Sequence, residues 1–82
     1  MHYFYVLRSL LDRNLYYGQT ADLRKRLVEH NAGRVKSTEQ RRPLEIIYYE
    51  AYNSKELAIN REHTVKRSGT AREALRKRIL GP

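Results

Sequence analysis

The stretch His2-Tyr-Phe-Tyr-Val-Leu-Arg8, followed after a polar gap by Leu15-Tyr-Tyr-Gly-Gln19, decides the fold of this chain. Aromatic and β-branched residues favour strands, in which alternate side chains point to opposite faces of a sheet. Alternate residues from Tyr3 onwards therefore share one face, and those from Phe4 onwards share the other, so we expect a strand buried on both faces. Asp12-Arg-Asn14 has the composition of a turn, which predicts that the two stretches pair as a hairpin.

Downstream of the hairpin, the sequence predicts a third strand and three helices. The apolar stretch 44–51 is the expected strand. The first helix is expected to have Thr20 as its N-cap and to stop at Asn31-Ala-Gly33. Residues 34–43 form a polar loop without periodicity. The predicted fold is therefore α+β, a small three-stranded antiparallel sheet flanked by about three helices, in a single domain spanning residues 1–82.

The two later helices are placed by their caps. Ser54 is expected to cap a helix that runs to about Arg67. Its inward-facing residues are expected to be Leu57, Ala58 and Val65. Gly69 is expected to end this helix, and Thr70-Ala-Arg-Glu73 has the pattern of a capping box that opens the last helix.

Composition narrows the classes of function. The chain has 17 Lys and Arg against 9 Asp and Glu, a formal net charge of +8, which favours a polyanionic partner such as nucleic acid. The absence of cysteine excludes thiol catalysis and fits a reducing cytosol. No stretch approaches the roughly 20 apolar residues that a membrane span needs, and no signal peptide is apparent. We therefore expect a cytoplasmic protein, with association with the nucleoid as the alternative, and no membrane partner.

Six polar side chains have no simple structural role in this predicted fold. They are Tyr5, Tyr16, Tyr17, Arg26, His30 and Glu62. Arg26 and His30 are four residues apart and border the apolar face of the first predicted helix. Glu62 falls at the edge of the buried stripe of the next helix. Together with the tyrosines of the hairpin, these residues are expected to line one shallow cleft.

This arrangement resembles the GIY-YIG nuclease superfamily. The first half-motif matches as Tyr3-Phe4-Tyr5 and the second as Tyr16-Tyr17-Gly18. The helix arginine of the family falls on Arg26, its frequent histidine on His30, and its metal-binding glutamate on Glu62. The likeness covers about residues 2–69 and is to the small stand-alone bacterial members, which are similar to the N-terminal nuclease domain of the bacterial excinuclease.

The resemblance implies a metal-dependent endonuclease that hydrolyses phosphodiester bonds in DNA. It also suggests structured or damaged DNA as the substrate and a role in repair or recombination. It implies that Glu62 holds one Mg²⁺ or Mn²⁺ and that Arg26 binds the phosphate. A water must be deprotonated, and Tyr5, Tyr16 and His30 all remain candidates for the general base.

Basic residues outside this set predict the path of the nucleic acid. They are Arg24, Lys25, Arg34, Lys36, Arg41, Arg42, Lys66 and Arg67. The sequence leaves open the choice between DNA and RNA and the oligomeric state, with a weak homodimer or a partner protein as alternatives to a monomer.

Three other interpretations fit the same residues. The first is a nucleic-acid binding module of the same fold that cuts nothing, and the second is a protein-interaction domain that meets an acidic partner. The third is purely structural, with the tyrosines packing the sheet and Arg26 forming an ion pair with Glu62 across two helices.

Overall fold

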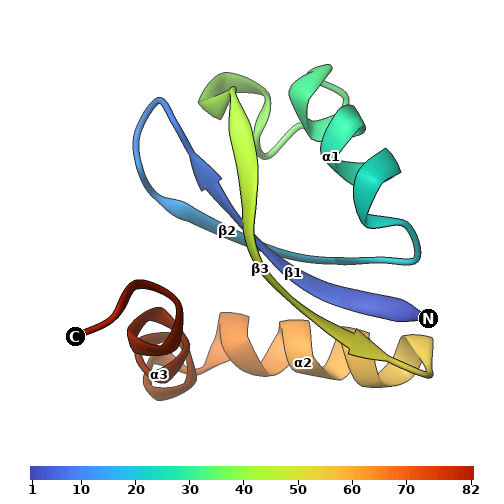
Figure 1. Ribbon diagram of the computed structural model, residues 1–82, viewed down its shortest axis with the longest axis vertical. Helices are drawn as coiled ribbons and strands as arrows, with labels where there is room; N and C mark the ends of the chain where they lie inside the picture. Colours follow the sequence, from blue (N-terminus) through green and yellow to red (C-terminus); the bar gives the residue numbers. More distant parts are fainter.

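A computed structural model, which describes residues 1–82, places a three-stranded antiparallel sheet between two layers of helix (Figure 1). The elements in chain order are β1 (His2–Ser9), β2 (Leu15–Thr20), α1 (Leu23–Asn31), the 3₁₀ helix η1 (Glu39–Arg41), β3 (Leu44–Tyr52), α2 (Lys55–Arg67) and α3 (Gly69–Leu80). The strand order is β2-β1-β3, so β1 is the central strand. The predicted α+β class, the hairpin and the three helices are confirmed.

The central strand is buried on both faces, as its alternation predicts. On the face covered by α2 and α3, one core cluster contains Phe4, Val6, Val65 and Leu75. On the face covered by α1, a second cluster contains Tyr5, Leu7 and Leu44. Neighbouring residues of β1 therefore belong to different cores, one under each layer of helix.

An acidic residue of β3 fixes α2 to the sheet. The carboxylate of Glu50 accepts two hydrogen bonds from the guanidinium of Arg61, at 2.9 and 3.2 Å. It also accepts the hydroxyl protons of Tyr48 at 2.7 Å and Tyr52 at 2.6 Å. The Arg61 guanidinium lies 5.6 Å from the centroid of the Phe4 ring. This charge on the inner side of α2 is therefore compensated by hydrogen bonds and an aromatic ring.

The first helix begins later than the sequence predicts. Its N-cap is Asp22, whose side chain accepts a hydrogen bond from the backbone N–H of Lys25 at 3.0 Å. Thr20 is still paired with Tyr3 in the sheet, so its backbone is extended, and its hydroxyl instead accepts from the Asp22 N–H at 3.1 Å. The expected Thr20 cap was wrong because the strand continues through that residue. The predicted stop is confirmed, since α1 ends at Asn31 and Gly33 has a φ of +78°.

The junction between the last two helices also differs from the prediction. Ser54 does cap α2, but Ser68 both ends α2 and caps α3 through the backbone N–H of Ala71 at 3.1 Å. Gly69 therefore opens α3, and the predicted capping box at residues 70–73 is wrong because these residues already lie inside the helix.

The inner face of α2 differs from the prediction at one position. Ala58 and Val65 are buried as expected, whereas Leu57 is 49% exposed. The helix faces the sheet through the row of Ala58, Arg61 and Val65, and Leu57 lies outside that row. None of the helices is both long and apolar enough to cross a membrane.

Candidate active site

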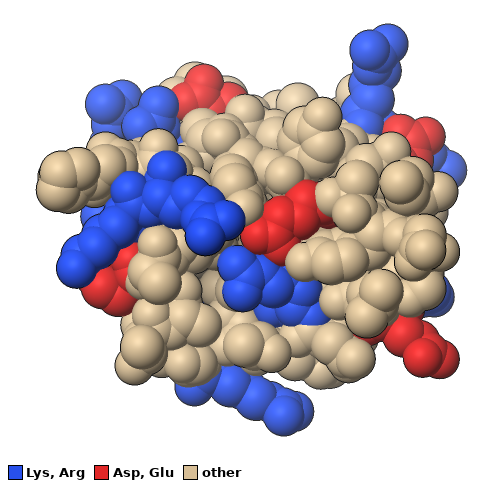
Figure 2. All heavy atoms as spheres, turned by 60° about the horizontal axis from the view of Figure 1, so that its bottom comes forward, with Lys and Arg blue, Asp and Glu red and all other residues tan.

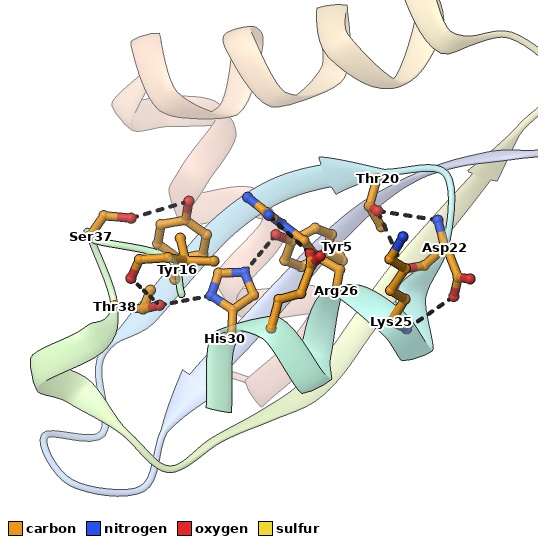
Figure 3. A network of polar contacts seen from close by, with 11 residues as sticks. Tyr5, Tyr16, Thr20, Asp22, Lys25, Arg26, His30, Ser37 and Thr38 are labelled. Atoms are coloured by element: carbon orange, nitrogen blue, oxygen red, sulfur yellow. Dashed lines mark hydrogen bonds and ion pairs between the residues drawn. The ribbon is translucent and has the colours of Figure 1, made fainter. Parts of the chain in front are cut away.

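The two motif tyrosines and the two helix residues meet on the α1 face of the sheet (Figure 3). Tyr5 lies on β1 and Tyr16 on β2, and both belong to the cluster packed against α1. Arg26 and His30 project from α1 towards them. Four of the predicted site residues are therefore brought together by a hairpin and the helix that follows it. The expectation that Tyr17 joins them is wrong, because successive residues of a strand face opposite sides and Tyr17 packs on Phe4 in the other core.

His30 is the buried centre of this group. Its ring is completely inaccessible to solvent, and its Nε2 lies 2.8 Å from the Tyr5 hydroxyl. Its Nδ1 lies 2.7 Å from the hydroxyl of Thr38. The ring of Tyr16 packs edge-on against the imidazole, with 5.2 Å between centroids. Burial, followed by the positive charge of Arg26, lowers the pKa of His30 to about 4, so the ring is neutral at physiological pH.

Gly18 allows Tyr5 to take this position. The two residues are paired across the strands, and a Cβ on Gly18 would lie 2.4 Å from both Cζ and Oη of Tyr5. No side chain fits in that space, because ordinary contacts between carbon atoms are about 3.5–4.0 Å. The glycine of the second half-motif therefore makes room for the tyrosine of the first.

Arg26 stands at the solvent side of Tyr5. Its Nη1 forms an ion pair with Glu29 at 3.2 Å, and 36% of its side chain is exposed. Hydrogen bonding to the Tyr5 phenol raises the pKa of Arg26. Burial raises the pKa of Tyr5 to about 12, although the neighbouring Arg26 opposes this effect. The guanidinium also lines an open pocket of about 360 Å³, whose wall includes Lys25 and Gln19.

Glu62 comes from the other layer of helix. It lies on α2, with 15% of its side chain exposed, and its carboxylate pairs with Lys66 at 2.8 Å. The Lys66 ammonium is in turn 5.5 Å from the centroid of the Tyr16 ring. The negative charge of Glu62 is one of the smaller causes that raise the pKa of Tyr5, after burial. Glu62 is therefore connected to Tyr16 through Lys66, although α2 covers the opposite face of the sheet.

The structural interpretation that paired Arg26 with Glu62 is wrong. Arg26 pairs with Glu29 and Glu62 pairs with Lys66, so each has a partner on its own helix.

The carboxylate of Glu62 fits a divalent metal of the magnesium type. The chain contains no group of three or more His, Asp or Glu side chains able to enclose a metal ion. A single hard oxygen ligand with water completing the shell is the coordination that Mg²⁺ commonly takes in proteins. Binding there requires only that the Lys66 ammonium leave the carboxylate.

The eight basic residues predicted to follow the nucleic acid fall into two groups. Arg41 forms an ion pair with Asp12 at 3.0 Å, and Lys66 is paired with Glu62. The other six form no ion pair and are exposed; they are Arg24, Lys25, Arg34, Lys36, Arg42 and Arg67. Figure 2, which turns the α2 and α3 side forward, shows further Lys and Arg side chains spread over that face with acidic groups between them. Positive charge is therefore not restricted to the neighbourhood of the tyrosines.

Thr38 is a site residue that the sequence analysis missed. It is fully buried and contacts His30, but it comes from the polar loop between α1 and β3, where no periodicity marks an inward-facing side chain. Its buried position depends on how the loop folds, because Thr38 is the N-cap of the short helix η1, which no pattern in the sequence marks.

Comparisons with known proteins agree with this geometry. A family model described as the GIY-YIG catalytic domain matches residues 1–76, and the chain belongs to the GIY-YIG family. Within it, the chain is similar to small bacterial UPF0213 proteins. UPF0213 proteins from Streptococcus pyogenes serotypes M3 and M5 are each 45% identical to it over 74 residues, which cover 89% of this chain and 79% of theirs.

A solved structure supports the same assignment. The solution NMR structure of the UPF0213 protein BH0048 from Bacillus halodurans is 35% identical in sequence, with a TM-score of 0.60. The match covers 99% of this chain and 87% of that one. The resemblance to small bacterial GIY-YIG proteins is thus confirmed over nearly the whole chain.

Proposed function

We propose that this protein is a divalent-metal-dependent nuclease that hydrolyses phosphodiester bonds in DNA. The observation that carries the proposal is the meeting of Tyr5, Tyr16, Arg26 and His30 on one face of the sheet, with Glu62 connected to Tyr16 through Lys66. Membership of a family defined by its catalytic domain supports an enzymatic role.

Arg26 is the phosphate-binding group in this proposal. A guanidinium presents a planar fork of N–H donors that matches two oxygens of a phosphate. Arg26 lies beside the buried phenol of Tyr5 and also lines an open pocket at the start of α1, so a phosphate can approach the guanidinium from solvent. The present partner, Glu29, is half-buried and is exchanged for the phosphate when substrate binds.

Proton removal from the attacking water passes through Tyr5. His30 is the more basic group at neutral pH, but it has no accessible surface and cannot touch the water itself. Tyr5 is nearly as buried, at 2% exposed, but it contacts His30 at 2.8 Å and lies beside Arg26, so in this proposal its oxygen receives the water held at the bound phosphate. The water proton goes to the Tyr5 oxygen as the Tyr5 proton moves to Nε2 of His30.

The remaining bond changes follow from this proton transfer. The water oxygen forms the new bond to phosphorus, the bond to the leaving sugar oxygen breaks, and solvent water protonates that oxygen. His30 then returns its proton to solvent through Tyr5, which restores the starting state. A bound phosphate also neutralises the Arg26 charge, which is the second cause of the low His30 pKa, so substrate binding increases the basicity of the ring.

Glu62 would hold the divalent ion, because it is a hard oxygen ligand that is connected to Tyr16 through Lys66. When bound, such an ion supplies positive charge that stabilises the phosphate as negative charge grows in the transition state. Lys66 leaves the carboxylate in this state and stays at the face of Tyr16, where its charge also favours a phosphate.

A second candidate, a nucleic-acid binding module without catalysis, is favoured by one observation. The Glu62 carboxylate forms an ion pair with Lys66. If this ion pair persisted in the presence of a divalent metal, the metal could not bind to Glu62. In that case the exposed cations of α1 and the following loop would bind phosphates, and affinity would fall steeply with salt.

The test is cleavage of duplex, branched and single-stranded DNA, and of RNA, with Mg²⁺ or Mn²⁺. Cleavage is expected to be lost in Glu62→Ala and Arg26→Ala proteins and retained in Glu73→Ala, which removes an exposed, unpaired carboxylate on α3. Equal cleavage in all three variants would refute the proposed nuclease. Salt-sensitive binding without cleavage would favour the second candidate.

A further inference from the structure

A chain of buried hydrogen bonds runs inwards from Tyr5. It starts at the Tyr5 hydroxyl, beside Arg26, continues through both nitrogens of His30, and ends at Thr38. His30 and Thr38 are both completely buried, and no buried side-chain nitrogen or oxygen in the protein lacks a partner. The direction of each bond in such a chain is set by what its two ends can donate or accept.

At the outer end of the chain, the Tyr5 hydroxyl lies beside a group that can only donate. The Arg26 guanidinium has N–H donors and no acceptor, so it cannot take the Tyr5 proton. That proton can therefore point to Nε2 of His30, which then accepts it as an unprotonated nitrogen. A neutral imidazole with a bare Nε2 carries its hydrogen on Nδ1.

The inner end of the chain agrees with this direction. The Thr38 hydroxyl has two neighbours, Nδ1 of His30 at 2.7 Å and the carbonyl oxygen of Val35 at 3.4 Å. The carbonyl can only accept, so the hydroxyl donates to Val35 and its oxygen accepts from Nδ1. The inner end therefore selects the tautomer that the outer end allows.

Thr38 is held firmly enough to play this part. Its backbone N–H donates to Val35 at 3.1 Å, and its carbonyl accepts from Arg41 at 2.9 Å, which closes the turn of η1. The buried hydroxyl of Ser9 on β1 donates to the Arg41 carbonyl at 2.6 Å. The loop that carries Thr38 is therefore fixed to the central strand.

We propose that Thr38 is a positioning residue that holds His30 as the Nδ1–H tautomer, so that the Tyr5 proton points inwards and an oxygen lone pair of Tyr5 faces the attacking water. This inference rests on the proposed nuclease function for its consequence, although the tautomer itself does not depend on catalysis. With the opposite tautomer, Nε2–H would donate to Tyr5, and the phenol could not pass its proton to the ring.

The tautomer can be measured directly. Long-range ¹H–¹⁵N correlation spectra of the ¹⁵N-labelled protein distinguish the two neutral forms of histidine, and we expect His30 in the Nδ1–H form. In Thr38→Val, which keeps the shape of the side chain and removes the hydroxyl, the ring is expected to change to the Nε2–H form. Cleavage is expected to fall about 100-fold in the same variant. Thr38→Ser, which restores a hydroxyl, should recover both.

The outcomes separate this inference from the proposed function. A His30 ring in the Nε2–H form in the unsubstituted protein overturns the inference, and so does a Thr38→Val protein that is folded and keeps the Nδ1–H form. If Thr38→Val does not fold, the spectra of the unsubstituted protein and of Thr38→Ser decide the question alone. Absence of cleavage in the unsubstituted protein, with the Nδ1–H form present, contradicts the nuclease and leaves the tautomer assignment intact.

Discussion

Replacing Gly18 with alanine should separate Tyr5 from His30. The new methyl carbon would lie 2.4 Å from Cζ and Oη of Tyr5, whereas ordinary carbon contacts are about 3.5–4.0 Å. The phenol must therefore retreat by about 1 Å. Its ring is only 2% exposed and lies in a packed cluster, and a shift of that size stretches the 2.8 Å bond to His30 beyond hydrogen-bonding distance.

The cost of this change can be bounded from the same geometry. Inserting a methyl group into a well-packed core costs about 1–3 kcal/mol of stability. A misplacement of about 1 Å at a reacting group costs about 100-fold in rate. Urea unfolding and DNA cleavage measured on the same Gly18→Ala protein therefore give two independent numbers. Gly69→Ala is the matched control, because its methyl would meet only Arg72 Nη2, at 3.6 Å, and little change is expected in either.

The reasoning fails if Gly18→Ala unfolds at the same urea concentration as the parent protein and cleaves equally well. That result would mean that the Tyr5 ring yields without loss, and that its position beside His30 is unimportant for both folding and catalysis.

Three further changes test other parts of the molecule. Glu50→Gln replaces one acceptor oxygen by an N–H donor that faces hydroxyl and guanidinium donors, so the free energy of unfolding measured in urea should fall by about 2 kcal/mol. Glu56→Gln, which changes an exposed and unpaired carboxylate, is the control and should cause almost no loss of stability. The pKa of His30 is about 4 in the folded protein and near 6.5 in the unfolded chain, so the unfolded chain binds a proton first as the pH falls. The contribution of His30 to the free energy of unfolding is therefore complete above pH 6.5 and is lost as the pH drops towards 4. Between pH 7 and 5 this amounts to about 2 kcal/mol, and a His30→Gln protein should lack that part of the slope in thermal unfolding. Tyr5→Phe should keep the fold and lose about 100-fold or more in cleavage, and unchanged cleavage would exclude the proposed path of the proton.

The strands and their buried faces could be predicted because the alternation of β1 has a strict period of two. Both cores follow directly from that pattern. The ends of the helices were less predictable, because several residues near each end can act as caps. Thr20 and Asp22 both suit the N-cap of α1, and only the extent of β2 decides between them.

The site was predictable where a helix or strand fixes the direction of a side chain, and it was not predictable elsewhere. Arg26 and His30 are one helical turn apart, so their common position follows from the spacing alone. Thr38 lies in an aperiodic loop, and its contact with His30 depends on how that loop returns to β1. The structural interpretation paired Glu62 with Arg26, whereas its partner is Lys66 on the same helix. The sequence shows which charges can lie near one another, but not which of several cations pairs with the carboxylate.

The adjacent residues Tyr16 and Tyr17 limit the ways in which the hairpin can misfold. Tyr17 stacks on Phe4 in one core, while Tyr16 packs against His30 in the other. If β2 paired with β1 one residue out of register, the two rings would exchange faces, and all the remaining side chains of β2 would also point to the opposite face of the sheet. A slipped molecule would thus lose its hydrophobic interior and the arrangement of its candidate site together, so this slip cannot produce a well-packed fold with the site disrupted.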